Sequence, residues 1–276
     1  MQNANSRGYL HEKYRLFHSS DRRDMDFQSH FHDFHKIILC LSGHVTYIME
    51  GKTHFMRPWD LMIIPANQIH HSSFDSSQTY ERIILWIQED FLRSFEEDVL
   101  CDVFRWPFRS QCGLFRPDAS SRRELLEKLL ALEQSQSASF AGHRLLADSY
   151  LVQFLVSLHT LLERKEVPSG DSVRSDPRLE EMLTFINGNL SEDLSISRLS
   201  RQFFISPSYL MSQFKQHTGC TVHQYVLQKR LIQAHQDIQT GEAIVSASQR
   251  AGFSDYSTFL RAFRKMFGCL PSELHS

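Results

Sequence analysis

The chain has few cysteines and lacks a long apolar run. Its five cysteines are odd in number and none stands in a Cys-x-x-Cys pair, which argues against a disulfide framework and a zinc ribbon. We expect reduced, mostly buried thiols at Cys40, Cys101, Cys112, Cys220 and Cys269. We expect no stretch to be long and apolar enough to span a membrane, and the N-terminal residues lack the apolar core of a signal peptide. The sequence therefore predicts a cytoplasmic protein.

The chain also lacks a strong net charge. A formal charge of −2 and a pI near 6.7 differ from the basic composition expected of a nucleic-acid-binding protein. The charge is unevenly distributed, because residues 178–276 hold 10 Lys and Arg against 8 Asp and Glu, whereas residues 1–177 hold 20 against 24. A DNA site in the C-terminal part would have a small positive excess, and would also use helix N-termini and backbone amides to contact phosphates.

What the sequence does contain is an internal repeat. Within residues 205–220 and 253–269, an apolar pair, a cation, a glycine and a cysteine recur in the same order at a constant offset of 49. The matched pairs are Leu210 with Phe259, Phe214 with Phe263, Lys215 with Arg264, Gly219 with Gly268, and Cys220 with Cys269. One unit thus occurs twice, and its spacing predicts a helix-turn-helix in each copy.

Capping residues set the predicted helix ends of the first copy. Ser191 can cap a short helix that carries Ile196 and Leu199 on one side. A second helix follows almost at once, with Ser206 as a strong N-cap and Gly219 as the residue that ends it. The first copy therefore has a supporting helix and a second helix that can read DNA.

The second copy has corresponding residues that begin and end its helices. Ile244 begins the supporting helix and Gly252 forms the turn. Ser254 or Asp255 can cap the second helix, and Gly268 ends it. In both copies one apolar pair is expected to form the buried face of the second helix: Leu210 with Phe214, and Phe259 with Phe263.

The opposite faces of the two second helices carry polar and cationic side chains that could meet DNA. They are Ser208, Met211, Ser212 and Lys215 in the first copy, and Tyr256, Ser257, Leu260, Arg261 and Arg264 in the second. Two such helices held by one core suit major grooves about one helical turn (~34 Å) apart. The alternative, a helical bundle without a DNA role, is disfavoured by the repeat and its caps.

At these residues the chain resembles the C-terminal domain of AraC-type transcription regulators, over residues 178–276. The resemblance includes Arg230, Leu231 and Ala234 of the connecting helix and the closing motif from Gly252 to Pro271. It implies that exposed residues of the two second helices touch bases. Among the candidates Arg261 is favoured, because a guanidinium can pair with guanine through two hydrogen bonds.

The sequence departs from the family pattern at two places. Ala247 and Ser248 stand where the family usually has an Ile-Ala pair, and Asp237 replaces a usual leucine. We expect these departures to weaken packing more than DNA reading.

The N-terminal part has a different pattern of apolar and turn-forming residues. Residues 9 to about 90 contain short apolar runs separated by Ser-Gly, Glu-Gly and Arg-Pro, which are typical of strands and turns. Closely spaced strands without helices between them indicate an antiparallel double sheet of the jelly-roll kind. The predicted fold class is α+β, with a cupin-like β domain at residues 1–118 and an all-α domain at residues 178–276. A chain of 276 residues with 41% hydrophobic content can bury both cores.

A group of histidines marks a candidate site in the β domain. His30 and His32 are two apart and face the same side of a strand, and His70 could join them. This set resembles the metal-binding pattern of cupins, but Lys36 occupies the position of the cupin glutamate. An ammonium group repels a divalent cation and supplies no oxygen ligand, so no metal and no cofactor are predicted.

Two other roles for these histidines remain open. They could be buried hydrogen-bonding residues at strand ends. The favoured interpretation is ligand recognition, in a pocket formed by His30, His32, Lys36 and His70, with Trp59, and also Phe31 and Tyr47, as walls. Such a pocket suits a hydroxylated or anionic small molecule, for example a sugar or a sugar acid.

Between the two domains, residues 119–166 are rich in leucine at helical spacing. Two antiparallel helices are predicted, at residues 120–136 and 142–165. Their apolar stripes exceed what one face of a β domain needs, which favours a homodimer. Residues 167–177 are dominated by Pro, Gly, Ser and Asp and are predicted to be a linker.

The sequence therefore predicts a sequence-specific transcription regulator that binds promoter DNA, responds to a small molecule, works with RNA polymerase and is not an enzyme. One alternative is a metal-dependent cupin enzyme fused to a DNA-binding domain, with Glu50 or Asp60 replacing the missing oxygen ligand. Another is an adaptor that recruits a protein partner through the helical pair and senses nothing.

Overall fold

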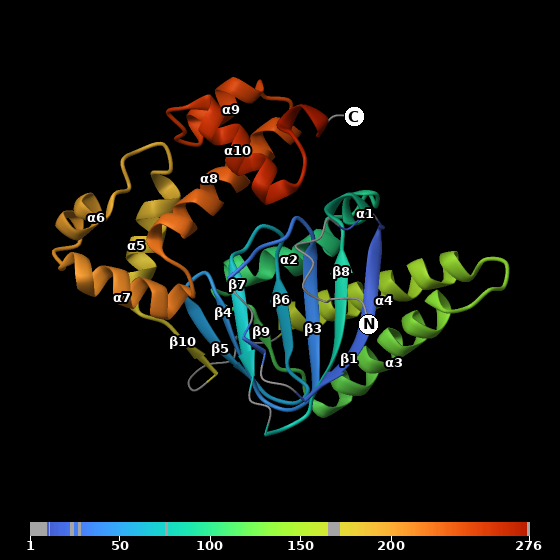
Figure 1. Ribbon diagram of the computed structural model, residues 1–276. Helices are drawn as coiled ribbons and strands as arrows, with labels where there is room; N and C mark the ends of the chain where they lie inside the picture. The colour runs from blue at the N-terminus through green and yellow to red at the C-terminus, as the bar shows by residue number, and fades with distance from the viewer. Residues whose placement is uncertain are drawn as a thin grey trace. The chain divides into compact units, whose positions relative to one another are not determined.

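The computed structural model describes residue 10 and residues 12–22, 25–26, 29–74, 77–164 and 172–274. The chain divides after Arg174 into two compact units (Figure 1). The first contains the strands and the helical pair, and the second contains both copies of the repeat. Each unit is described separately below.

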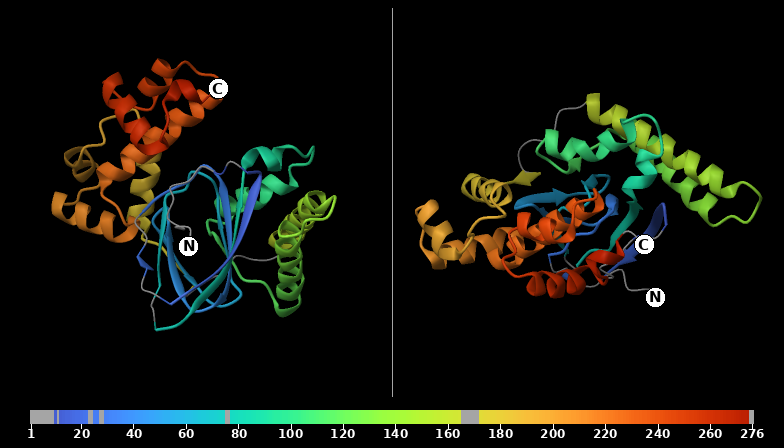
Figure 2. Two further views of the ribbon diagram at one scale, coloured as in Figure 1. Left: turned by 45° about the vertical axis from the view of Figure 1, so that its right-hand side comes forward. Right: turned by 90° about the horizontal axis from the view of Figure 1, so that it is seen from above.

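The described strands of the first unit form two five-stranded antiparallel sheets (Figures 1 and 2). The first sheet has the order β1 (Tyr14–Asp21), β8 (Tyr80–Ile87), β3 (His35–Ser42), β6 (Leu61–Ile64) and β9 (Leu114–Phe115). The second has the order β10 (Val173–Arg174), β5 (Lys52–Met56), β4 (Val45–Met49), β7 (His70–Phe74) and β2 (Met25–Asp26). Strands 1-8-3-6 in one sheet and 2-7-4-5 in the other make the two Greek keys of a jelly roll, which confirms the predicted fold class.

Alternation along the strands explains which side chains lie between the sheets. In β4, Val45, Tyr47 and Met49 are buried, and they pack against Ile38 and Cys40 of β3. The intervening residues of β3 point to the opposite face of the first sheet and join a second apolar core with the helices: Ile37 and Leu39. Strand β3 is therefore buried on both faces, and its even-numbered residues line the space between the sheets.

Four helices that come after β8 in the chain pack on the outer face of the first sheet. They are α1 (Glu89–Arg93), α2 (Val99–Arg109), α3 (Ala119–Gln136) and α4 (His143–Arg164). Helices α3 and α4 lie side by side and antiparallel (Figures 1 and 2), which confirms the predicted helical pair. The short helix α1 and helix α2 were not predicted, although Leu100, Val103 and Phe104 have helical spacing and are buried.

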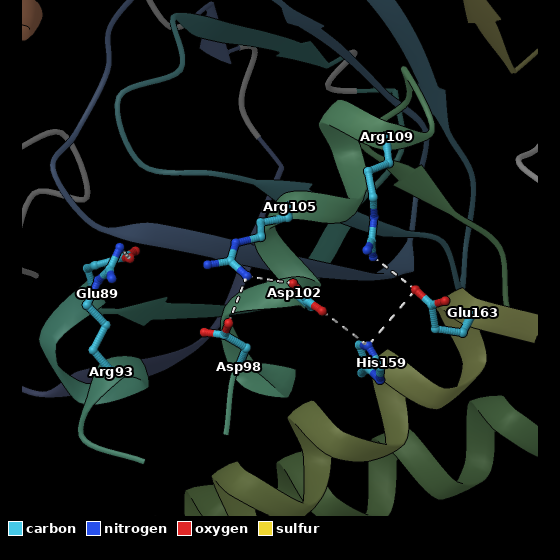
Figure 3. A network of polar contacts seen from close by, with 8 residues as sticks. All are labelled: Glu89, Arg93, Asp98, Asp102, Arg105, Arg109, His159 and Glu163. Carbon is cyan, nitrogen blue, oxygen red and sulfur yellow. Dashed lines mark hydrogen bonds and ion pairs between the residues drawn. The ribbon is translucent and has the colours of Figure 1, made fainter. Parts of the chain in front are cut away.

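Polar contacts connect α2 to α4 above the apolar core (Figure 3). Arg109 binds Glu163 at 2.9 Å, and Nε2 of His159 lies 4.0 Å from carboxylate oxygens of both Asp102 and Glu163. Asp102 also accepts a hydrogen bond from Arg105 at 2.9 Å. Exposed pairs of this kind contribute about 0 to 1 kcal/mol each, so the buried leucines and phenylalanines provide most of the stabilisation of this packing.

By length and composition, α4 could cross a membrane, so the expectation that no stretch could do so was wrong. One face of α4 packs in the core of the first unit. Leu151, Phe154, Leu155 and Leu158 are fully buried in the core that α4 shares with the first sheet. The helix is long enough because it has 22 residues, and its hydropathy is high because its outer face carries apolar side chains such as Leu145 as well.

The predicted linker at residues 167–177 falls only partly within the described residues, since residues 165–171 lie outside them. Beyond that gap, Val173 and Arg174 form β10, paired with His54 and Thr53 of β5. Asp176 then caps the first helix of the second unit through the amide of Arg178. A short strand thus occupies part of the segment expected to be linker, and the exact domain boundaries remain predictions.

The second unit is helical throughout its regular structure. Its elements are α5 (Pro177–Gly188), α6 (Ile196–Gln202), α7 (Pro207–Thr218), α8 (Val222–Gln239), α9 (Ile244–Arg250), α10 (Tyr256–Phe267) and the 3₁₀ turn η1 (Pro271–Glu273). Ser206 and Asp255 cap α7 and α10 as predicted, and Gly219 and Gly268 end them with left-handed φ angles of 75° and 77°. The predicted cap Ser191 was wrong, because α6 begins after Ser195, whose side chain accepts from the amide of Arg198.

Candidate functional site

Helices α6 and α7 form the first helix-turn-helix. Leu210 and Phe214 of α7 are buried as predicted, and the Phe214 ring packs edge-on against Tyr225 of α8 at 5.5 Å between centroids. Because this face of α7 is fixed in the core, the opposite face is turned to solvent. The helix therefore presents a defined set of side chains.

Helices α9 and α10 repeat this arrangement. Phe259 and Phe263 are fully buried, and their rings lie 5.4 Å apart. Phe267 and His235 extend the cluster, since the His235 ring stacks on Phe267 at 4.6 Å. Burial lowers the pKa of His235 to about 4, so the imidazole is neutral in the folded chain at pH 7.

Helix α8 connects the two motifs through residues on which the family resemblance was based. Leu231 and Ala234 are buried, and the Arg230 guanidinium donates to the carbonyl oxygens of Leu190 and Glu192, at 2.8 Å each. The loop that precedes α6 is thus attached to the connecting helix. Both helix-turn-helix motifs share this support.

The departures from the family pattern are accommodated in the core. Ala247 and Ser248 are buried. The Ser248 hydroxyl donates a hydrogen bond to the Val245 carbonyl at 2.7 Å, so this buried polar group has a partner. Asp237 is buried as well, and its Oδ1 accepts from Gln233 at 2.8 Å. Its Oδ2 has no hydrogen-bond partner among the described atoms, which marks a weaker point of packing.

The candidate DNA-reading residues lie on the accessible sides of α7 and α10. Eight of them are exposed and Leu260 is half-buried; the exposed ones are Ser208, Met211, Ser212, Lys215, Tyr256, Ser257, Arg261 and Arg264. Arg261 donates to Thr258 Oγ1 at 3.2 Å, which orients its guanidinium without using all of its donors. Base contact by these residues remains a prediction.

Two residues on the same faces were missed by sequence reasoning. Tyr209 is 48% exposed and Thr258 is exposed, and each lies three positions before a candidate residue, Ser212 or Arg261. They correspond at the repeat offset of 49, which is the signal that could have found them. A tyrosine at this position offers a ring and a hydroxyl to DNA.

Not every cation near the motifs is equally available to phosphate. Arg198 of α6 pairs with Glu192 at 3.2 Å, and Arg250 of α9 pairs with Glu242 at 2.6 Å. No such pair is found for Arg261, Arg264 or Lys265 among the described residues. The cationic side of α10 is therefore the strongest candidate for electrostatic attraction to DNA in this unit.

In the first unit, three histidines converge at one end of the space between the sheets. His30 and His70 face each other across an antiparallel bridge, with N–O distances of 3.0 and 2.9 Å, and their ring centroids are 4.5 Å apart. His32 completes the group at 4.9 Å from His70. One ring nitrogen from each of the three lies within 4.8 Å of the other two.

Hydrogen bonds set the orientation of two of these rings. Nδ1 of His32 lies 2.8 Å from the Phe34 carbonyl oxygen, and Nδ1 of His70 lies 2.9 Å from the Gln68 carbonyl oxygen. Since a carbonyl only accepts, each Nδ1 carries the proton and each Nε2 has a free lone pair. Burial, together with the charges of Lys36 and His30, holds the pKa of both imidazoles well below the ordinary value.

Lys36 enters the same space from β3, two residues before Ile38 on the same face. Its ammonium lies 5.9 Å from the centre of the Trp86 ring, its neighbour in the strand register. Burial, and secondarily the charge of Arg82, lowers the Lys36 pKa to about 8. Arg82 is paired with Asp21 at 2.6 Å, whereas no described carboxylate lies within ion-pair distance of Lys36.

The structure does not bring Trp59 to this group. Trp59 lies in the turn between β5 and β6, and its amide donates to the carbonyl of Cys40 at 2.6 Å. Cys40 is four residues along β3 from Lys36, which corresponds to roughly 13 Å of strand. Trp86 is the tryptophan beside Lys36. Tyr47 does point between the sheets, and Phe31 is half-buried next to His30 and His32.

The two acidic residues considered as replacement metal ligands are engaged elsewhere. Both oxygens of Asp60 accept from Arg116, at 2.7 and 2.8 Å. Glu50 accepts from the amide of Ile69 at 2.7 Å. Neither belongs to the cluster that the three histidines form. None of the five cysteines, all of them among the described residues, forms a disulfide, and four of them are buried, as predicted.

Known protein families match both units. A family model described as an AraC-like ligand binding domain matches residues 14–183, and one described as a helix-turn-helix domain matches residues 199–276. The HTH-type transcriptional activator RhaS of Escherichia fergusonii is 23% identical over 252 residues, which cover 90% of this chain and 87% of that protein. The arabinose operon regulatory protein of Salmonella typhimurium is 25% identical, covering 86% and 82%.

Among solved structures, ToxT from Vibrio cholerae matches with a TM-score of 0.39 and 13% identity, over 96% of this chain and 98% of that chain. The ligand-binding family model alone covers more than half of the present chain. The chain therefore belongs to the AraC-type transcriptional regulators, which bind DNA through a helix-turn-helix domain and a small-molecule effector through an N-terminal domain.

Proposed function

We propose that the effector of this regulator is a sugar or a sugar derivative and that it binds between the two sheets, beside Lys36 and the three histidines. The observation that carries this proposal is the lysine. Lys36 is half-buried, and an ammonium without a carboxylate partner in such a site is costly; a ligand with a carboxylate or hydroxyl groups would reduce that cost. Imidazole lone pairs add hydrogen-bond acceptors for hydroxyl groups.

The similar proteins support the same class of effector. One of them is named for the arabinose operon, and the RhaS and RhaR proteins are named as transcriptional activators. At 22 to 25% identity these names indicate a class of regulator and leave the identity of the sugar open. By the same comparison we propose that the chain activates transcription by contacting RNA polymerase. We further propose that it acts in the cytoplasm and has no enzymatic activity.

The dimeric state is part of this proposal. Helix α4 buries one face in the first unit, while Leu145, Leu146 and Val156 remain exposed, with Leu145 75% exposed. Apolar side chains in these positions support association of two copies through the helical pair. Sedimentation equilibrium tests it: the wild-type chain should be dimeric, and Leu145→Asp should shift it toward monomer. A wild-type chain that stays monomeric at micromolar concentrations would refute this part.

The effector proposal is tested by DNA occupancy across the genome, with and without candidate sugars. Peaks upstream of sugar-use genes that change with one sugar would support it and would identify the effector. Lys36→Ala should then weaken binding of that sugar and the transcriptional response together. Lys13→Ala is the matched control, because Lys13 is exposed on the same unit and pairs with Asp148. If Lys36→Ala left both affinity and response unchanged, the pocket would be wrongly assigned.

A further inference from the structure

The free lone pairs of the histidine cluster allow a second binding chemistry besides hydrogen bonds to a sugar. His70 is 1% exposed and His32 is buried, and Nε2 of each has no hydrogen-bond partner among the described atoms. Both are acceptors, since their protons are committed to backbone carbonyls through Nδ1. A buried acceptor without a donor costs about 1 to 3 kcal/mol, so two side by side indicate a binding partner.

The number and spacing of the nitrogens indicate the kind of partner. A hydroxyl group has one proton and satisfies one acceptor, whereas a metal ion accepts lone pairs from several nitrogens at once. The three ring nitrogens lie within 4.8 Å of one another, and a Zn–N bond of about 2.0 to 2.1 Å would require small movements of the rings toward a common centre.

The surroundings of the rings match those of metal ligands. The second ring nitrogen of a metal-binding histidine usually donates a hydrogen bond to a carbonyl or carboxylate. This bond fixes the tautomer and orients the lone pair of the other nitrogen toward the metal. His32 and His70 both have this bond, to Phe34 and Gln68. The His32 ring is also held by stacking on Phe34 at 4.1 Å. The ligand atoms are therefore already oriented without a metal.

We propose that His30, His32 and His70 bind one divalent transition-metal ion, of the zinc, cobalt or nickel type, inside the sensor domain. This inference adds to the proposed effector pocket but does not depend on the effector being a sugar. Three imidazoles leave a coordination position open, and they bring no negative charge to offset the ion. With Lys36 nearby, an anionic group on the effector would be favoured at that open position.

Lys36 is the main argument against a metal, because its charge repels a cation. Two facts reduce its weight. The ammonium lies against the face of Trp86, and it belongs to β3, whereas the histidines come from β7 and the segment before β3. The aromatic ring stabilises the cation on its own side of the space. An anion between Lys36 and the metal would be attracted by both.

The test uses the full-length chain and the metal alone, without any sugar. Purified protein is dialysed against Zn²⁺ and then against metal-free buffer, and the retained metal is measured by mass spectrometry. We expect one equivalent per chain in the wild type and in His71→Gln, and loss of binding of at least about tenfold, or 1.4 kcal/mol, in His32→Gln and His70→Gln. His71 is the matched control because it neighbours His70 on β7 and points to the opposite face.

A second measurement needs no variant, in case the substitutions prevent folding. Co²⁺ added to the wild-type chain should give the visible absorption bands of cobalt in a site of low coordination number, saturating at one equivalent, and Zn²⁺ should remove them. Absence of retained metal and of these bands in the folded wild-type chain would overturn the proposal. So would full retention in a folded His32→Gln/His70→Gln double variant, because the metal would then be held elsewhere. Loss of sugar response with intact metal binding would refute the effector proposal alone.

Discussion

The carbonyl oxygen of Leu190 accepts a hydrogen bond from Nε of Arg230 at 2.8 Å, which joins the loop before α6 to the connecting helix α8. The turn of the second motif reaches the same atom. A Cβ built on Gly252 would lie 2.3 Å from this oxygen and 3.0 Å from the Arg230 guanidinium. The first motif, the connecting helix and the second motif thus meet at one point.

Gly252→Ala should therefore destabilise the DNA-binding unit more than a left-handed backbone angle alone would. The matched control is Gly241→Ala, because Gly241 has a similar φ of +93°, against +89° at Gly252, but open space around it. We expect Gly241→Ala to cost about 1 to 2 kcal/mol from the backbone. Gly252→Ala should cost about 1 to 3 kcal/mol more from the clash.

Urea unfolding followed by circular dichroism measures both variants. Equal losses of stability would show that the Leu190 carbonyl and Arg230 can move away from an added methyl group. The three-way contact would then be of little importance for the domain.

Arg261→Ala should relax base specificity at one operator position, at a cost of about 1 to 3 kcal/mol, because it removes two hydrogen bonds to one base. Arg261→Lys keeps the charge but not the planar pair of donors, so it should lose the same discrimination. Lys265→Ala, on the same exposed side of α10, should weaken all sequences alike. Binding to a library of operator variants separates these outcomes. A uniform loss in Arg261→Ala would mark a phosphate contact instead.

Phe263→Ala should destabilise the chain by about 3 to 5 kcal/mol, because the ring is fully buried between Phe259, Phe267 and His235. Phe204 provides the control, since it is 94% exposed in the turn between α6 and α7. Phe204→Ala should change stability by less than about 0.5 kcal/mol. A folded Phe263→Ala chain with wild-type stability would contradict the buried assignment.

Local signals in the sequence were sufficient for much of this architecture. The cap Ser206 and the terminal Gly219 and Gly268 were predicted because the side chain or backbone of each residue determines the helix end by itself. Asp255 was one of two caps predicted for α10, with Ser254 as the other. The prediction of Ser191 as a cap was wrong because it also rested on one residue considered by itself. Its segment offers several residues able to cap, and Ser195, which follows the buried Leu194, is the one whose side chain accepts from the helix.

The site in the β unit shows what local signals leave out. The spacing of His30 and His32 placed them on one side of a strand, but their approach to His70 depends on a bridge between segments 40 residues apart in sequence. Trp59 and Trp86 are equally aromatic, and only the register of β3 with β8 puts Trp86 beside Lys36. Strand register at such a distance is decided by the whole core, which no short motif contains.

The neutral His235 should make the DNA-binding unit sensitive to mild acid. Its folded pKa is about 4, below the ordinary 6.5, so between these values the unfolded chain binds a proton that the folded chain does not. The free energy of unfolding should therefore fall as pH decreases from about 6.5 to 4, by about 1 to 3 kcal/mol from this residue. His235→Gln should remove that slope, whereas His223→Gln, exposed on the same helix, should not.

Hydrogen exchange of peptides from α8 and α10 in the full-length chain measures this slope in the second unit alone, away from the buried histidines of the first unit. The expected result is faster exchange at pH 5 than at pH 7, after correction for the intrinsic rate, in the wild type and in His223→Gln. In His235→Gln the two values should agree. If all three proteins showed the same pH dependence, His235 would be protonated in the folded chain without loss of stability, and its stacking on Phe267 would have to tolerate a charged ring.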